Sequence, residues 1–456
     1  MGWTTSAMTT DIRAKTVGEL RESGYHVASV KEELRRNLIQ KIRNRQEILP
    51  GIVGYEESVI PQLENAILSG QDIIFLGERG QAKSRMIRAL VTLLDGHIPV
   101  IAGCEIKDNP FHPICRRCRD QRYGEKLATP DITIADLIGE VDPIKVAEGR
   151  YLADELTIHY GLLPRTNRGI FALNELPDLA ERIQVGLLNI MEERDVQIRG
   201  YKVRLPLDLF VVASANPEDY TNRGRIITPL KDRFGSQIRT HYPRRPGDEI
   251  AIMEAEHTRF ATDGLRVACP DYMREVVAEL THLARRSSEI SQRSGVSVRV
   301  SICNYENLLS SALKRAIRTG ERDVAPRVSD LGAIVASTSG KIELETLGDA
   351  SEEKVLGKLV QKAVLTVFSR RFAAGELDAV VAAFQDGLRV EVSDTMASAE
   401  YARQVAAVPA LATAAGKLGA GDPASAAAAV EFVLEGLHLS RKLNKDAEGG
   451  RLRYRS

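Results

Sequence analysis

Short apolar runs bounded by turn residues recur through the first half of the chain. Such runs predict buried strands, and between them apolar residues recur at helical spacing, as in 59–68 and 179–193. The strand-like runs occupy residues 72–76, 98–101, 169–175, 207–214 and 236–239. Strands that alternate with helices in this way predict an α/β fold with a parallel sheet.

The second half of the chain has a different pattern and is almost wholly helical from Pro246 on. The predicted helices span 248–257, 270–287 and 301–318, and an Ala-rich helical stretch follows from about 340. Asp422-Pro423 predicts a helix start, since Asp caps free N–H groups and Pro suits the first helical position. The final residues are basic, and we expect them to be frayed.

Three further stretches have patterns of their own. Residues 11–47 alternate charged and apolar positions at helical spacing, which predicts one or two helices packed against the main domain. Residues 196–205 alternate around a glycine and predict a β-hairpin. Residues 129–168 hold short elements with many turns, too irregular for a simple connection, and we interpret them as an insertion.

The loop after the first predicted strand carries the clearest chemistry. It reads Gly77-Glu78-Arg79-Gly80-Gln81-Ala82-Lys83-Ser84 and is followed by a predicted helix. A strand, a glycine-containing loop that ends in Lys-Ser, and a helix form the context of a P-loop, whose N–H groups bind phosphate oxygens. Lys83 is then expected to reach the β- and γ-phosphates of ATP, and Ser84 to ligate Mg²⁺.

One position of this loop departs from the usual pattern. Ala82 stands where glycine is commoner. A methyl group is tolerated there if the residue keeps a negative φ, so we expect a mild effect. The alternative interpretation of the whole stretch is a glycine-containing turn beside a chance Lys-Ser pair.

The strand at 169–175 ends in a pair of polar residues, Asn174 and Glu175. In a P-loop protein this strand end supplies a Mg²⁺ ligand acting through water and a carboxylate that polarises the attacking water. We assign Asn174 to the first role and Glu175 to the second. Asn174 replaces the usual Asp and brings no charge to the metal. Asn216, at the tip of the next strand, is expected to orient the same water.

A candidate metal site lies between the second and third predicted strands. Cys104, His112, Cys115 and Cys118 fall close together, and Cys115 and Cys118 have zinc-knuckle spacing. Three thiolates and an imidazole would complete a tetrahedral structural Zn²⁺ site. The pattern lacks a second Cys-x-x-Cys pair, so reduced cysteines beside a basic loop remain the alternative.

Composition narrows the class of protein. Lys plus Arg and Asp plus Glu balance at 62 each, which argues against a protein that coats nucleic acid. No stretch is long and apolar enough to span a bilayer, and no secretory signal is visible. The five cysteines do not suggest a disulfide framework. We therefore expect a cytoplasmic protein that binds neither membrane nor nucleic acid.

These motifs, in this order, resemble those of the AAA+ ATPases. Within that class the chain is similar to the branch of the MoxR proteins and the magnesium-chelatase ATPase subunit, which carries a hairpin like 196–205 and an insertion like 129–168. The resemblance covers about 50–340. It implies that Ile52, Val53 and Gly54 lie against adenine, that Asn216 is sensor 1, that Arg233 is an arginine finger, and that Arg299 is sensor 2. Arg225 is a weaker second finger candidate.

The resemblance also implies an organisation and a function. We predict an N-terminal helical segment at 1–47, an AAA+ nucleotide-binding domain at 48–245, a helical lid at 246–340 and a helical C-terminal region at 341–456. The branch implies a hexameric ring that hydrolyses ATP with a partner containing a von Willebrand factor A domain, either to remodel a protein substrate or to insert a metal or cofactor.

Three alternatives stay open at this point. The chain is similar enough to the branch to be a magnesium-chelatase ATPase subunit proper, although nothing in it identifies a porphyrin site. Asn174 also fits a scaffold that binds ATP and hardly hydrolyses it. A transcriptional activator would carry a Gly-Ala-Phe-Thr-Gly-Ala loop and a helix-turn-helix, and we find neither.

Overall fold

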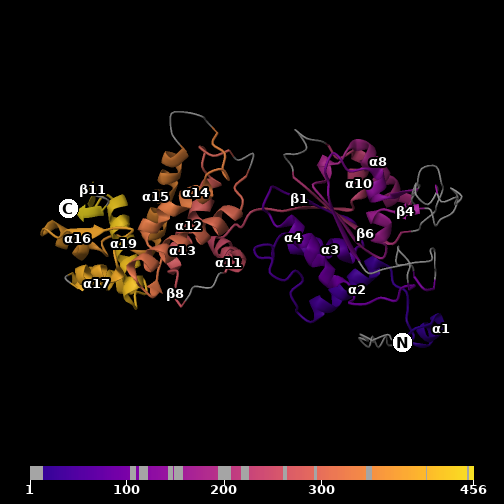
Figure 1. Cartoon of the computed structure of the whole chain (residues 1–456), viewed down its shortest axis with the longest axis horizontal. Coiled ribbons are helices and arrows are strands. Elements are labelled where there is room, and N and C mark those ends of the chain that lie inside the picture. The colour runs from indigo at the N-terminus through magenta and orange to yellow at the C-terminus, as the bar shows by residue number, and fades with distance from the viewer. Residues whose placement is uncertain are drawn as a thin grey trace. The chain divides into compact units, whose positions relative to one another are not determined.

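The structure is a computed structural model of the 456-residue chain (Figure 1). It describes residues 14–102, 109–111, 122–141, 147, 158–193, 207–216, 225–259, 264–291, 295–345, 352–406, 408–448 and 451–456. The chain divides into two compact units, one of Met1–Glu78 with Ala82–His241 and one of Arg79–Gln81 with Tyr242–Ser456. The hairpin predicted at 196–205 lies outside the described residues. The four-part division of the chain stays a prediction.

A five-stranded sheet forms the centre of the first unit, and it is parallel, as the sequence predicts. Its strand order is β2-β5-β6-β1-β7. The strands are β1 (Ile73–Leu76), β2 (Tyr123–Leu127), β5 (Gly169–Asn174), β6 (Leu209–Ala215) and β7 (Ser236–Arg239). Neighbouring strands are all parallel, so every strand ends at the same edge of the sheet.

Helices cover both faces of this sheet (Figure 1). On one face lie α2 (Val30–Arg43), α3 (Val59–Leu68) and α4 (Lys83–Ala89), and on the other α8 (Glu181–Glu193) and α10 (Thr228–Arg233). Alternate residues of one strand serve the two cores, since Ile73 and Phe75 pack with the first group while Ile74 packs with the second. Burial on both faces explains why the inner strands β1, β5 and β6 are largely apolar along their length.

The prediction of a strand at 98–101 is wrong. These residues form no strand, and the strand beside β5 is β2, at Tyr123–Leu127. Pro99 has no N–H to give to a ladder, and its carbonyl instead accepts a 2.8 Å hydrogen bond from Nη1 of Arg168.

Short elements occupy the described parts of 129–168, in keeping with the irregular pattern there. They are α5 (Ile134–Leu137), β3 (Gly139–Val141), β4 (Ile158–Tyr160) and α7 (Leu162–Arg165). The strands β3 and β4 pair antiparallel in a sheet of their own.

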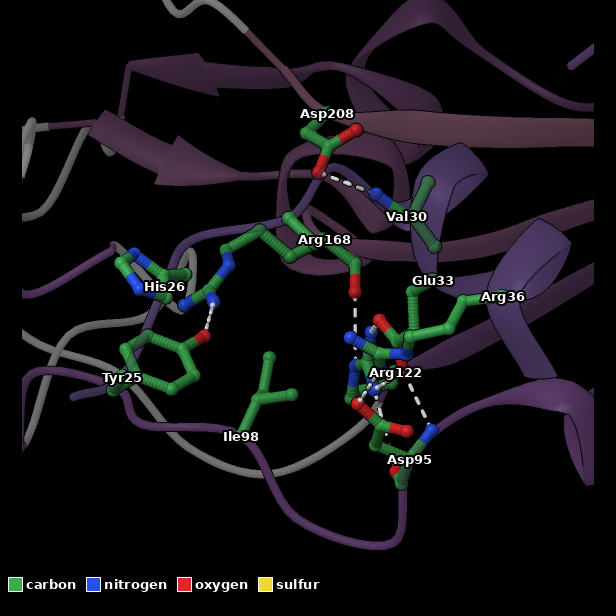
Figure 2. Close-up of a pocket in the computed structure, with 11 residues that line it drawn as sticks. Tyr25, His26, Val30, Glu33, Arg36, Asp95, Ile98, Arg122, Arg168 and Asp208 are labelled. Atoms are coloured by element: carbon green, nitrogen blue, oxygen red, sulfur yellow. Dashed lines mark hydrogen bonds and ion pairs between the residues drawn. The ribbon is translucent and has the colours of Figure 1, made fainter. Parts of the chain in front are cut away.

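The N-terminal segment forms α1 (Val17–Glu22) and α2, and α2 docks at the starting edge of the central sheet. The N–H of Val30 donates to Oδ2 of Asp208 at 2.9 Å, just before β6. Glu33, which is buried, accepts two hydrogen bonds from Arg122, just before β2. These groups line a small polar pocket (Figure 2), in which Arg168 also contacts the hydroxyl of Tyr25.

The second unit is mainly helical. Its helices are α11 (Pro246–Glu256), α12 (Asp271–Ala284), α13 (Arg299–Thr319), α14 (Ile334–Thr338), α15 (Glu352–Arg371), α16 (Asp378–Gln385), α17 (Ser398–Ala406), α18 (Pro409–Lys417) and α19 (Pro423–Leu439). Asp422 caps α19 through its side chain and Pro423 opens the helix, as the sequence predicts. Two short strands, β8 (Arg266–Val267) and β9 (Asp323–Val324), pair in parallel.

The expectation of frayed terminal residues is wrong. The strand β12 (Arg451–Arg455) lies between β10 (Val390–Val392) and β11 (Asn444–Glu448) in an antiparallel sheet. Tyr454 is buried, and its hydroxyl donates to Glu435 on α19. Apolar residues alternate with arginines through this strand, a two-residue period that a basic composition conceals. Among the described residues, no helix has the length and apolar character needed to cross a membrane.

Candidate functional site

The glycine-containing loop joins the end of β1 to the start of α4, as the P-loop interpretation requires. The helix begins at Lys83, directly after the loop. Gly80 has a φ of 76°. Ala82 has a φ of 56° and a ψ of 18°, which is left-handed backbone. The expectation of a negative φ at Ala82 is therefore wrong, and the conformation has a cost, because an L-residue with a Cβ loses about 1–2 kcal/mol in this region.

Lys83 lies over its own loop. Its side chain is buried, and Nζ donates to the carbonyl oxygen of Glu78 at 2.9 Å and to that of Gly77. An ammonium that bonds two loop carbonyls sits at the mouth of the loop, where a bound phosphate would lie in a P-loop protein. The lysine is thus placed to exchange these carbonyls for phosphate oxygens.

The ends of β5 and β6 bring a group of small polar side chains to Ser84. Oδ1 of Asn174 accepts hydrogen bonds from Oγ of Ser84 at 3.3 Å and from Oγ of Ser214 at 3.1 Å. The structure therefore brings together Ser84 and Asn174, two residues that the sequence assigned to one metal site. Ser214, on β6, was not singled out by the sequence pattern because it lies inside an otherwise apolar strand.

Glu175 follows Asn174 in an unusual backbone conformation. Its φ is 54° and its ψ is 48°, and its N–H donates to Oγ of Ser214 at 3.3 Å. A left-handed conformation at a residue with a side chain costs energy, and such residues cluster at functional sites. The turn ends β5 and begins the short 3₁₀ helix Leu176–Asp178, which fixes where the carboxylate leaves the strand.

The structure adds a residue that the sequence did not indicate, Glu125 on β2. Its Oε1 accepts a 2.6 Å hydrogen bond from Nδ2 of Asn174. Arg88 on α4 donates to both of its oxygens, at 2.8 and 2.9 Å, and the hydroxyl of Tyr123 donates at 3.0 Å. Mainly because of the hydrogen bonds from Arg88, the pKa of Glu125 lies below its usual value. The sequence analysis did not single out Glu125, because it did not predict the strand β2.

Asn216 is buried and directly follows β6, the strand that lies between β5 and β1 in the sheet. It therefore lies at the same edge as Asn174 and the loop. Ile52 is buried in the core beneath α3 and α4, and Gly54 has a φ of 85°. Contact of Ile52, Val53 and Gly54 with adenine stays a prediction.

The three arginines assigned by resemblance are exposed. Arg233, the last residue of α10, forms an ion pair with Glu192 on α8. Arg225 precedes α10, and its carbonyl accepts from Nε2 of Gln184 at 3.0 Å. Arg299 is the first residue of α13, which begins two residues before the helix start predicted at 301. It belongs to the second unit, and its role toward the loop stays a prediction.

The residues proposed for zinc, namely Cys104, His112, Cys115 and Cys118, lie outside the described residues. Within the part of the chain that the structure describes, no group of three or more His, Cys, Asp or Glu side chains is arranged to hold a metal ion.

Comparison with known proteins supports the sequence resemblance. The chain is 30% identical over 192 residues to the magnesium-chelatase 38 kDa subunit of Acidiphilium rubrum, which covers 40% of this chain and 54% of that protein. It is 26% identical over 313 residues to the magnesium-chelatase subunit ChlI of Nephroselmis olivacea, covering 62% of this chain and 85% of that protein. The chain thus spans little more than half of the first relative. No protein-family model matches it.

A similar solved structure is a model of the complex between subunits BchI and BchD of magnesium chelatase. It is 20% identical to this chain and covers 67% of this chain and 97% of the other, with a TM-score of 0.35. That score is too low to support any conclusion about this chain.

The parallel sheet, the loop between β1 and α4, and the polar strand ends beside it form an α/β core with a P-loop, which is the fold that the AAA+ resemblance predicts. The chain is similar to magnesium-chelatase subunits over part of its length, in keeping with the branch predicted from the motifs.

Proposed function

We propose that the chain is an AAA+ ATPase that hydrolyses ATP within a ring of identical subunits. The observation that supports this best is the convergence of Ser84, Asn174 and Ser214 at the start of α4, with Glu175 next to them. A loop for phosphate, oxygen ligands for a metal and a carboxylate for water are the parts that phosphoryl transfer needs.

The residues present fit Mg²⁺. This ion prefers oxygen ligands and usually keeps several waters, and the oxygens of Ser84 and Asn174 lie 3.3 Å apart. Ser84 would hold the ion directly, and Asn174 would do so through water. When bound, Mg²⁺ neutralises charge on the phosphates.

The protein's own groups divide the remaining work. Lys83 binds the β- and γ-phosphates once its ammonium leaves the loop carbonyls. The carboxylate of Glu175 accepts a proton from the attacking water. Asn216, at the neighbouring strand end, orients that water through its side-chain amide. Each role follows from the place of the residue at the carboxyl edge of the parallel sheet.

In a ring, the exposed arginines of one subunit can act on the nucleotide of the next. Arg233 is exposed at the end of α10, a place that suits a finger reaching the γ-phosphate in a neighbouring subunit. Arg299 acts as sensor 2 from the lid helix. The resemblance favours a hexamer.

The magnesium-chelatase relatives support a partner subunit, which we propose contains a von Willebrand factor A domain. Through it the ring would remodel a protein substrate or insert a metal or cofactor. The alternative is that the chain is itself the chelatase subunit. Zinc at Cys104, His112, Cys115 and Cys118 remains part of this proposal, and elemental analysis of the purified protein that finds no zinc would remove it.

A second candidate function is a scaffold that binds ATP and hardly hydrolyses it. The neutral Asn174 at the metal site favours this candidate, because an amide brings no charge to the metal. Steady-state ATPase assays separate the two. A rate that Glu175→Gln abolishes supports the motor, and no rate above background supports the scaffold.

A further inference from the structure

Side chains from β5, α4 and β2 meet at the carboxylate of Glu125, which itself lies on β2. Asn174 from β5 donates to Oε1 at 2.6 Å, and Arg88 from α4 donates to Oε1 at 2.9 Å and Oε2 at 2.8 Å. The hydroxyl of Tyr123, two residues away on β2, donates to Oε2 at 3.0 Å. Four hydrogen bonds hold this carboxylate, so its position between β2, α4 and β5 is defined.

This arrangement determines which way the amide of Asn174 faces. A carboxylate accepts hydrogen bonds and cannot donate them, so only the NH₂ group of Asn174 can face Glu125. Oδ1 must then face the other way, where it accepts from Ser84 and Ser214. An amide that donates to a charged acceptor is also polarised, which makes its oxygen a stronger acceptor.

We propose that Glu125 is a positioning residue for the magnesium–nucleotide site: it holds Asn174 with its oxygen toward Ser84, so that a neutral amide serves where an acid is usual. The proposal rests on the proposed function, because it assumes that Ser84 and Asn174 hold the metal of a bound nucleotide. Neighbouring groups that orient a metal ligand typically contribute about 10- to 100-fold to metal affinity.

The test measures binding of a fluorescent ADP analogue to the full-length protein, with excess EDTA and across a MgCl₂ titration. We expect Glu125→Ala to raise the half-saturating Mg²⁺ concentration about tenfold or more, while affinity in EDTA stays unchanged. Glu125→Leu carries the test if the alanine variant does not fold, because it fills more of the same space but offers no acceptor to the NH₂ of Asn174. Glu391→Gln is the matched control, since Glu391 is also held by arginines but lies on β10 in the second unit.

A second pair of variants separates orientation from general damage. Asn174→Asp alone places a second carboxylate beside that of Glu125. It should raise the half-saturating Mg²⁺ concentration above that of Glu125→Ala. Asn174→Asp combined with Glu125→Gln should restore it, because the glutamine amide can then donate to the new carboxylate. Equal loss in EDTA and in Mg²⁺, or an unchanged Mg²⁺ requirement in folded Glu125 variants, would overturn the proposal. A wild-type protein that binds no nucleotide would overturn the proposed function as well.

Discussion

The amide nitrogen of Asn174 donates a 2.6 Å hydrogen bond to the carboxylate of Glu125. The two residues lie on neighbouring parallel strands, with Asn174 opposite Leu127 in the register, two residues beyond Glu125. Asn174, which lacks the carboxylate usual at this position, therefore has a carboxylate as its hydrogen-bond partner in the fold. The absence of a carboxylate at position 174 does not by itself predict an inactive site.

Loss of the proposed finger should reduce hydrolysis more than binding. We expect Arg233→Ala to lower the ATPase rate about 10³-fold with nucleotide affinity largely intact, because a finger acts on charge in the transition state. Arg182→Ala, at an exposed arginine on α8, is the control. Mixing Arg233→Ala with Glu175→Gln subunits should recover part of the activity, since one interface type then has both groups. Equal loss of rate and affinity would contradict the assignment.

Relief of backbone strain should stabilise the loop. Ala82 has a φ of 56°, so Ala82→Gly should raise the free energy of unfolding by about 1 kcal/mol. Ala89→Gly is the control, because Ala89 has a helical φ of −64° and its replacement should lower stability by about 1 kcal/mol. Urea denaturation at pH 7 measures both. A destabilised Ala82→Gly variant would count against the strained conformation.

The second unit depends on a buried carboxylate. Glu249 on α11 accepts from Arg285 at 2.7 and 3.1 Å and from Ser301 at 2.6 Å, which ties α11 to α12 and α13. Removing one partner of a buried ion pair costs about 3–5 kcal/mol, so Glu249→Ala should be strongly destabilising. Glu376→Ala, at an exposed ion pair with Lys417, should change stability little. Urea denaturation of the two variants measures the difference, and equal stabilities would contradict this role of Glu249.

The same residue predicts a pH dependence. Burial raises the pKa of Glu249, but the nearby His282 and the hydrogen bonds from Arg285 and Ser301 outweigh burial and lower it below the usual value. A lowered folded-state pKa gives stability that is present above the unfolded pKa and is lost as the pH falls through the folded one. Wild-type stability should therefore fall below about pH 4–5. Glu249→Gln should flatten this slope, and an unchanged slope would contradict the assignment.

The sequence predicted the elements that are apolar on both faces. The strands β1, β5 and β6 were found because buried parallel strands leave no room for polar side chains. The strand β2 was missed because it reads Tyr-Gly-Glu-Lys-Leu, a segment without an apolar run and with only Gly124 buried. Its charged residue is the one that contacts Asn174, so the error in the strand concealed part of the site.

The sequence placed Lys83, Ser84 and Asn174 together because the loop and the strand end have fixed places in a P-loop core. The structure brings Ser84 and Asn174 into contact, and the roles of all three residues stay predictions. The left-handed backbone of Ala82 was not predicted, because alanine carries no sequence signal for a positive φ. The contact of Ser214 with Asn174 was not predicted, because it depends on two strands far apart in the sequence lying side by side.

The most direct test compares the ATPase rates of the wild-type protein and of Glu175→Gln, measured with Mg²⁺ and saturating ATP. We predict steady hydrolysis by the wild type and a loss of about 10²–10⁴-fold in the variant, which should still bind nucleotide. A wild-type rate no higher than background, or a variant that hydrolyses ATP as fast as the wild type, would contradict the proposal that Glu175 activates water at this site.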